Sequence, residues 1–328
     1  MHTRVPMALV VLLAAACGSG SATLPPTATG APAAATATTV VWPLRGTDAP
    51  NVEASKRRPI VVRVPNDPSA RPQSGLAQAD VVFEMLVEGG LTRYAVVFHS
   101  QDADKVGPIR SARLSDLQLT PMLRGILVHV GAQPQTLERL RDAAKRGDFV
   151  DIDQFAHPDA FDRVTDRAAP QNVYTSTKRI RDAAKDAAKV DVPALPFGEN
   201  GATGKDVGTF TVPYAGETRV TYEVAADGFK RTQGGRQTEV DPTNVVVIRT
   251  EVKEVPGYVE DELGSLSLDI RTTGEGPLVV LSGGKRYDGK WSRTGTDGFR
   301  FTDGSGAEIR LRPGLTWIHV IPLSFDVE

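Results

Sequence analysis

The sequence predicts an α+β (or α/β) N-terminal domain followed by a mostly antiparallel β C-terminal domain, after a signal peptide and a disordered tether. An apolar leader and an uncharged stretch open the chain. Strand-like and helix-like runs then alternate to about residue 190, and short strand-like runs with glycine turns follow. The predicted boundaries are 1–16 for the signal peptide, 17–41 for a lipidated Cys and the tether, 42–192 for the N-terminal domain, 193–208 for a linker and 209–328 for the C-terminal domain.

Composition limits the function of the chain. Its 328 residues carry 38 Lys+Arg and 40 Asp+Glu, a net charge of -2. This balance gives no overall basic field for phosphate binding, so we expect no nucleic-acid partner. The single Cys excludes a disulfide framework and the common Cys-based zinc sites. We predict no metal site and no cofactor.

The N-terminus has the pattern of a secretory signal peptide. A short basic start leads into the apolar run Met7–Ala16, which is too short to span a bilayer. The following string, Leu13-Ala-Ala-Ala-Cys17, resembles the lipobox of bacterial lipoproteins, although Leu stands one position earlier than is usual. That resemblance implies cleavage before Cys17, acylation (palmitate) of its sulfur and a lipid anchor on the extracytoplasmic face of the bacterial cell membrane. The alternative is an ordinary signal peptide in which Cys17 is incidental.

Residues 18–39 contain Ala, Thr, Pro, Gly and Ser, with one Leu and no charge. Such a segment buries too little apolar surface to offset its ordering entropy, so we predict a disordered tether.

The N-terminal domain is predicted from alternating patterns of period 2 and period 3.6. β-Rich composition indicates strands, and Ala, Leu, Lys and Arg-rich runs indicate helices. The expected strands are 59–64, 81–88, 91–99 and 125–130, and the expected helices are 112–123, 135–146 and 177–189.

The C-terminal domain is predicted to be mostly antiparallel β without a convincing helix. Its expected strands are 220–224, 244–250, 266–270, 278–281, 307–311 and 316–321, and its expected turns are Gly283-Gly284, Asp288-Gly289 and Asp303-Gly304. Its large aromatic residues are expected to lie in the core: Tyr222, Tyr287, Trp291 and Trp317.

One predicted strand carries an unusual acidic face. In Asp80–Glu88, alternation places apolar side chains on one face and Asp80, Glu84 and Glu88 on the other, with Val82 and Leu86. A two-residue hairpin turn at Gly89-Gly90 would pair Leu86 with Arg93 and bring Arg93 onto the acidic face.

A basic turn follows this hairpin. Gly107-Pro-Ile-Arg110-Ser111-Ala-Arg113 is predicted to enter a helix with Ser111 as its N-cap. Free amides at that helix start, together with Arg110 and Arg113, would form an anion site. The candidate ligand-binding residues at this groove are Asn66, Arg71, Glu84, Glu88, Arg93, Arg110, Ser111, Arg113 and His129.

Three interpretations of this constellation stay open. The groove could bind an envelope ligand or partner, with an envelope glycan, an anionic small molecule or an envelope protein as candidates. The chain could instead be a hydrolase or transferase acting on an envelope polymer, although no catalytic residue is predicted. The charged residues could also form only a structural ion-pair network within an interaction module.

Long strings of the chain resemble the YerB-type bacterial lipoproteins. The resemblance is carried by Arg71-Pro-Gln-Ser-Gly-Leu-Ala-Gln-Ala-Asp-Val-Val-Phe-Glu84, Val87-Glu-Gly-Gly-Leu-Thr-Arg93, Gly107–Arg113, Trp42-Pro-Leu-Arg-Gly46, Tyr222, Asp241-Pro-Thr-Asn-Val-Val-Val247 and Thr316-Trp-Ile-His-Val-Ile-Pro322. It implies a two-domain, membrane-anchored extracytoplasmic protein whose biochemical function is not established. It implies no catalytic residue and does not choose between an ion-pair network and a ligand groove.

Overall fold

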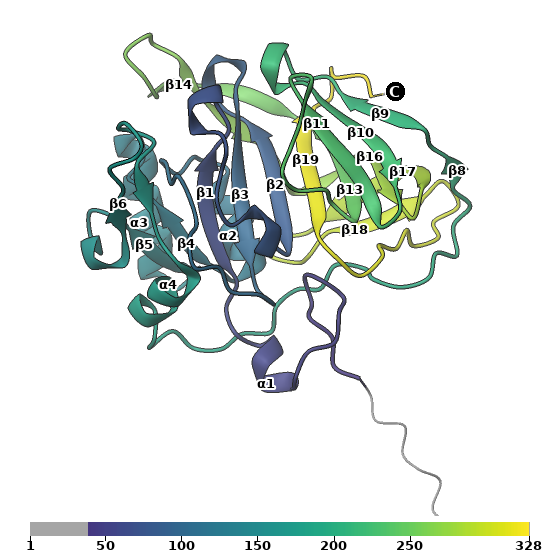
Figure 1. The fold of residues 1–328 in the computed structure, drawn as a ribbon, viewed down its shortest axis with the longest axis horizontal. Coiled ribbons are helices and arrows are strands. Elements are labelled where there is room, and N and C mark those ends of the chain that lie inside the picture. Colours follow the sequence, from purple (N-terminus) through teal and green to yellow (C-terminus); the bar gives the residue numbers. More distant parts are fainter. Residues whose placement is uncertain (1–38, 328) are drawn as a thin grey trace, which may run out of the picture. The chain divides into compact units, whose positions relative to one another are not determined.

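One large sheet organises the chain (Figure 1). The structure is a computed structural model that describes residues 39–327; Cys17, the signal peptide and most of the tether lie outside this range. The sheet has eleven strands, and its order along the main path is β18-β17-β16-β13-β19-β2-β3-β1-β4-β5, with β8 beside β17.

The helices and strands follow one another in a fixed order. The elements are α1 (Val52–Ser55), β1 (Ile60–Pro65), η1 (Pro68–Ala70), η2 (Leu76–Gln78), β2 (Val81–Leu86), η3 (Glu88–Gly90), β3 (Thr92–Phe98), α2 (Asp116–Leu123), β4 (Ile126–His129), α3 (Pro134–Lys145), β5 (Val150–Asp153), η4 (Pro158–Ala160), β6 (Asp162–Arg163), β7 (Val173–Tyr174), α4 (Thr177–Ala183), β8 (Lys205–Asp206), β9 (Thr209–Val212), η5 (Gly216–Thr218), β10 (Val220–Ala225), β11 (Gly228–Gln233), β12 (Arg236–Gln237), β13 (Asn244–Thr250), β14 (Val252–Val259), β15 (Leu266–Ile270), β16 (Gly274–Ser282), β17 (Lys285–Arg293), β18 (Arg300–Asp303) and β19 (Thr316–Pro322).

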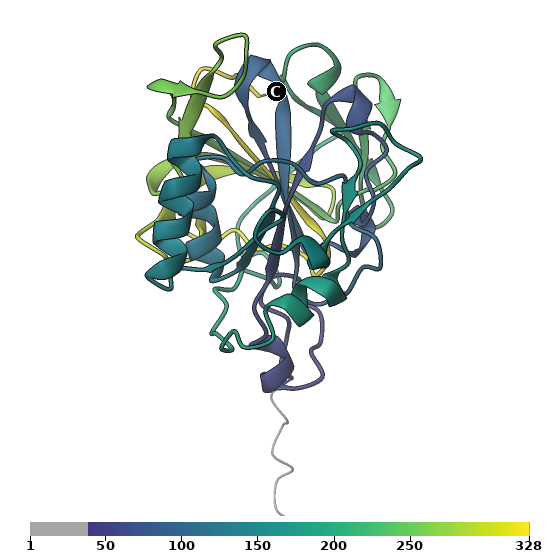
Figure 2. The same cartoon turned by 90° about the vertical axis from the view of Figure 1, so that its left-hand side faces the viewer.

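The N-terminal region is α/β, as its alternating patterns predict. Strands β1, β4 and β5 run parallel, and β3 lies antiparallel between β1 and β2. Leu119 and Met122 of α2 pack on one face of the sheet and Ile180 of α4 packs on the other. Helices therefore cover both faces, which is the arrangement that buried β-rich runs require (Figure 2).

The C-terminal region is mostly antiparallel β, as predicted. A second sheet of four strands, β12-β11-β10-β9, packs on the large sheet through Phe210, Tyr222 and Phe229, which meet Val245 and Leu281. The core aromatics are confirmed: Tyr222, Tyr287, Trp291 and Trp317 are all at most 8% exposed.

The N-terminal and C-terminal regions meet inside the large sheet. Strand β19, near the end of the chain, runs parallel to β2, and Glu84 lies opposite His319. One hydrophobic cluster contains residues from both regions, including Phe83 and Ile318. The junction between the regions is therefore an internal part of the fold, and it places the candidate site there.

Several predicted boundaries are wrong. The helix expected from 112 begins at Asp116, and the helix expected to reach 189 ends at Ala183. The pair Asp288-Gly289, expected to form a turn, lies inside β17. Gly289 lies so close to the neighbouring strand that a Cβ would be 2.1 Å from Thr302 O, which accounts for a glycine at this strand position. Residues 307–311 make only isolated bridges.

Within residues 39–327, no helix is both long enough and apolar enough to cross a membrane.

Candidate functional site

Glu84 lies in a strand that is covered on both faces. Strand β2 is flanked by β3 and β19, and register pairs Glu84 with Tyr94 on one side and His319 on the other. Residues at paired positions point to the same face of a sheet, so these three side chains meet beneath the four-stranded sheet. Glu84 is 0% exposed, and a buried carboxylate requires charged or hydrogen-bonding partners.

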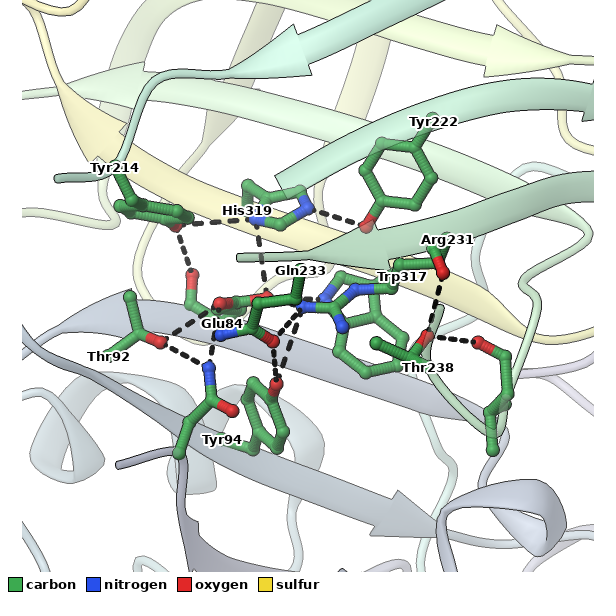
Figure 3. A network of polar contacts seen from close by, with 12 residues as sticks. Glu84, Thr92, Tyr94, Tyr214, Tyr222, Arg231, Gln233, Thr238, Trp317 and His319 are labelled. Atoms are coloured by element: carbon green, nitrogen blue, oxygen red, sulfur yellow. Dashed lines mark hydrogen bonds and ion pairs between the residues drawn. The ribbon is translucent and has the colours of Figure 1, made fainter. Parts of the chain in front are cut away.

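The carboxylate of Glu84 has a donor on every side (Figure 3). Oε2 accepts from Arg231 Nη2 and from Trp317 Nε1, both at 2.9 Å. Oε1 accepts from Thr92 Oγ1 at 2.9 Å and from Asn66 Nδ2 at 3.3 Å. The negative charge is therefore fully solvated by protein groups, and the N-terminal and C-terminal regions share the ion pair.

Arg231 comes from strand β11 of the smaller sheet. Alternation along β11 buries Phe229, Arg231 and Gln233 and leaves Lys230 exposed. The guanidinium carbon lies 4.3 Å from the centre of the Trp317 ring, a cation–π contact. Burial alone lowers the pKa of Arg231, but Tyr94 and Glu84 raise it above its ordinary value, so the side chain stays charged.

His319 belongs to the same network and connects Glu84 with two tyrosines of the C-terminal region. Its Nε2 lies 2.7 Å from Tyr222 Oη and its Nδ1 lies 3.3 Å from Tyr214 Oη. Nδ1 is also 3.6 Å from Glu84 Oε2. Burial, helped by the charge of Arg231, lowers the pKa of His319 well below its usual range. The imidazole is neutral, and its proximity to Glu84 is therefore not an ion pair.

A cavity of about 420 Å³ opens beside this network. Its floor is formed by Tyr94, Arg231, Gln233 and Trp317. One wall comes from the N-terminal region and the other from the C-terminal region. The wall residues are Pro68, Arg71, Pro72, Gln73 and Leu76 on the first side and Glu217, Gly234, Arg236, Gln237, Thr238, Glu239 and Val240 on the second. The volume falls within the range typical of small-molecule sites.

Arg71 connects the two walls. Its Nε donates to Asn66 Oδ1 at 3.2 Å, and its Nη2 donates to Asn66 O at 2.7 Å and to Glu217 O at 3.4 Å. Asn66 in turn donates to Glu84. Three of the predicted site residues, Asn66, Arg71 and Glu84, are therefore joined by hydrogen bonds, and of these three only Arg71 lines the cavity.

A second group of predicted residues forms a separate ion-pair cluster. Arg113 Nε donates to Glu88 Oε2 at 2.9 Å, and Arg113 Nη2 bonds the other oxygen. Arg93 Nη2 lies 4.0 Å from Glu88, and Glu260 lies 3.4 Å from Arg113 Nη1. Burial raises the pKa of Glu88, but Arg113 and Arg93 outweigh it and hold the pKa below its ordinary value.

The predicted hairpin register is wrong by one residue. Three residues, Glu88–Gly90, form the loop, so Met85 rather than Leu86 pairs with Arg93. Gly89 and Gly90 have positive φ as expected, at 70° and 73°. A three-residue loop accommodates two residues of positive φ as well as a two-residue loop does, so the glycines do not determine the loop length. The shift sends Arg93 to the face opposite Glu84. Arg231 pairs with that carboxylate instead.

The predicted anion site at Ser111 is also wrong in its geometry. The helix begins five residues later, so Ser111 caps nothing, and its carbonyl oxygen accepts from Arg93 Nη1 at 2.8 Å. The carboxylate of Asp116 accepts from the amide of Arg113 at 2.8 Å. Arg110 is half-buried in the same segment, and its amide donates to Arg63 O.

His129 lies in a third place, at the carboxyl end of β4. Its Nε2 is 2.8 Å from Asp151 Oδ1, and its Nδ1 is 2.9 Å from Gly131 O. Burial lowers the pKa of His129, but Asp151 raises it above its ordinary value. Among residues 39–327, no group of three or more His, Cys, Asp or Glu side chains is placed to hold a metal ion.

Sequence reasoning missed several residues of the buried network, above all Arg231 and Gln233. A signal existed, because Gly228–Gln233 alternates and places a charged and an amide side chain on the same face as Phe229. Their partner, however, lies far away: Arg231 and Glu84 are 147 residues apart in the sequence.

Known proteins share this architecture. The N-terminal domain of the family described as protein of unknown function (DUF3048) matches residues 44–190, and its C-terminal domain matches residues 209–318. The chain is 30% identical over 283 residues to "Putative lipoprotein YerB" of Bacillus subtilis, covering 82% of this chain and 83% of that protein. The crystal structure of the YerB protein from Bacillus subtilis superposes with a TM-score of 0.74 at 26% identity, covering 88% of this chain and 99% of the other.

Proposed function

The chain belongs to the YerB-like family of proteins of unknown function (DUF3048), and on this premise we propose that it is a lipid-anchored extracytoplasmic protein that binds an envelope ligand in the cavity above Arg231. The name of the Bacillus subtilis relative supports the anchor, as does the lipobox-like string that ends at Cys17. Acylation of Cys17 would hold the folded region at the membrane surface.

The observation that carries the ligand-binding proposal is the composition of the cavity floor. Arg231 and Gln233 are 1% and 4% exposed, yet both line a cavity of about 420 Å³. A buried charged group at the base of a concave site is costly to maintain for packing alone. Sites of this kind, with a few polar groups in a partly apolar cavity, are typical of ligand-binding pockets.

We propose binding rather than catalysis. The hydrolase or transferase alternative requires a nucleophile beside a base. The cavity lining contains the hydroxyl groups of Thr238 and Tyr94 and the carboxylates of Glu217 and Glu239. The hydroxyl groups donate to the backbone oxygens of Arg231 and Val240 and to the side chain of Gln233, and neither is hydrogen-bonded to a lining carboxylate. The interaction-module alternative is favoured by the Glu88–Arg113 cluster alone, since its charged ends pair with one another.

The anchor is tested by the mass of the mature N-terminus. Protein purified from membranes should begin at Cys17 and carry acyl chains, and Cys17→Ser should be released from the membrane fraction. A soluble, unmodified wild-type product would refute the anchor without affecting the cavity.

The ligand is tested by denaturing full-length protein from its own membranes and identifying released small molecules by mass spectrometry. Gln237→Trp, at an exposed lining position, should block the cavity. Lys230→Trp is the matched control, because Lys230 is exposed and does not line the cavity. We expect wild type and Lys230→Trp to release the same compound and Gln237→Trp to release at least tenfold less. Equal release from all three, or none from any, would contradict ligand binding at this site.

A further inference from the structure

The cavity floor has unused hydrogen-bond donors. Arg231 Nε and Gln233 Nε2 are buried and have no partner among residues 39–327. The acceptor atoms beside them are occupied: Gln233 Oε1 accepts from Tyr94 Oη at 3.1 Å and from Arg231 Nη2 at 3.0 Å. Buried donors without partners are rare in folded proteins because each one costs free energy. The remaining hydrogen-bonding capacity of the floor is therefore for an acceptor.

Glu84 does not occupy all the hydrogen-bond donors of Arg231. Its four hydrogen bonds come from four different side chains, of which Arg231 is one. Arg231 contributes only Nη2 to that pair. A guanidinium has five N–H groups in a planar fork, so one carboxylate bonded through a single nitrogen leaves others for a second oxygen ligand.

The charges around the cavity disfavour a ligand with two negative charges. Arg231 is paired with Glu84 directly behind the floor, and the other two cationic lining residues, Arg71 and Arg236, are matched in number by Glu217 and Glu239. With no surplus positive charge to offset it, a dianion is less well complemented here than a ligand with one charged group. The planar guanidinium of Arg231 and the planar amide of Gln233 also match the geometry of a carboxylate.

We infer that the cavity selects ligands that carry a carboxylate group, which accepts hydrogen bonds from Arg231 and Gln233. This inference rests on the proposed function, because it specifies the ligand of the same cavity. The partly apolar walls, with Leu76 and Val240, then contact the uncharged body of the ligand.

Matched compounds test this selectivity. The probes are a panel of several hundred small carboxylic acids, each paired with its primary amide, and phosphate monoesters with comparable bodies. Binding to the full-length chain is measured by calorimetry. We expect acids to bind at least tenfold more tightly than their amides, the range of a charge-assisted hydrogen bond. Among residues 39–327 no histidine lines the cavity, so the affinity for acids should change less than twofold between pH 6 and pH 8. The affinity for a phosphate monoester, whose second pKa is about 6, should vary over the same range.

One isosteric variant separates recognition from folding. Gln233→Glu keeps an oxygen for Tyr94 and Arg231 and replaces the Nε2 donor with an acceptor. The matched control is Gln237→Glu, which adds the same charge at an exposed lining position. We expect Gln233→Glu to lower the affinity for acids at least tenfold and the affinity for their amides less. We expect Gln237→Glu to change the affinity for acids by less than threefold.

The outcomes distinguish this inference from the proposed function. The inferred carboxylate selectivity is wrong if amides or phosphate monoesters bind as tightly as acids, or if the two variants lower the affinity for acids equally. In either case the cavity remains a binding site. If no compound in any arm binds saturably, the proposed ligand-binding function and the inference both fail.

Discussion

Two Glu–Arg pairs on one hairpin have opposite environments. Glu84 lies in strand β2 and pairs with Arg231, and both side chains are at most 1% exposed. Glu88 lies in the loop four residues later and pairs with Arg113, with side chains 14% and 9% exposed. The first pair joins segments 147 residues apart and borders a cavity, whereas the second joins segments 25 residues apart and is closed by its own partners.

The difference shows that charge density on a strand does not by itself identify a binding site. At Glu88 the charged ends of Arg93, Arg113 and Glu260 pair with one another and with Glu88 in an ion-pair network. At Glu84 the carboxylate is satisfied, but its partner Arg231 and the neighbouring Gln233 keep donors without partners beside a cavity. A buried donor without a partner among residues 39–327 is present in both clusters, since Arg93 Nε also has none. The cavity beside Arg231 and Gln233 is what distinguishes the second case.

The largest expected effect comes from breaking the buried pair. Arg231→Met should lower the free energy of unfolding by about 3–5 kcal/mol, because Glu84 would be left as an unpaired buried charge. Urea unfolding of the folded region measures it. The double variant Arg231→Met with Glu84→Gln should recover a large part of the loss, and a double variant no more stable than the single one would contradict this account of the pair.

A smaller effect is expected at the loop. Arg113→Met should cost about 1–2 kcal/mol, because Glu88 reaches solvent and keeps Arg93 at 4.0 Å, and because Glu260, which also loses Arg113, keeps the hydroxyl group of Ser267. Added salt should reduce this cost more than that of Arg231→Met, since partly exposed pairs are screened. Equal costs for the two arginine variants would remove the proposed distinction.

The smallest expected effect is a difference between the two clusters in how the free energy of unfolding depends on pH. The folded-state pKa of His319 lies below its unfolded value, so its contribution to stability is present above about pH 6.5 and is lost as the pH falls. Between pH 7 and pH 6 the free energy of unfolding should fall by about 0.7 kcal/mol less in His319→Gln than in wild type.

Glu88→Gln is the comparison for that measurement. The folded-state pKa of Glu88 is also lowered, so this carboxyl stabilises the fold above its unfolded value of about 4.5 and the stabilisation is lost only below it. Unfolding titrations from pH 7 to pH 4 therefore should show the two variants departing from wild type in different ranges. A common range would show that the two groups titrate together.

Local pattern predicted the fold class and the buried aromatics. It could not fix the hairpin register, because two glycines with positive φ suit either a two-residue or a three-residue loop, and one residue of shift moves Arg93 to the other face. It also missed Arg231, since nothing local indicates that β11 packs over β2. The pairing of β2 with β19 is equally long-range, and it is this pairing that places the cavity between the two regions.

The central claim is that the floor of the cavity binds a ligand and the Glu88 cluster does not. The most direct test is the amount of small molecule that mass spectrometry recovers from full-length protein with Gln233→Glu, compared with Arg113→Met. The account predicts at least a tenfold loss of bound compound in Gln233→Glu and recovery within twofold of wild type in Arg113→Met. Equal recovery from the two variants, or a larger loss in Arg113→Met, would contradict it.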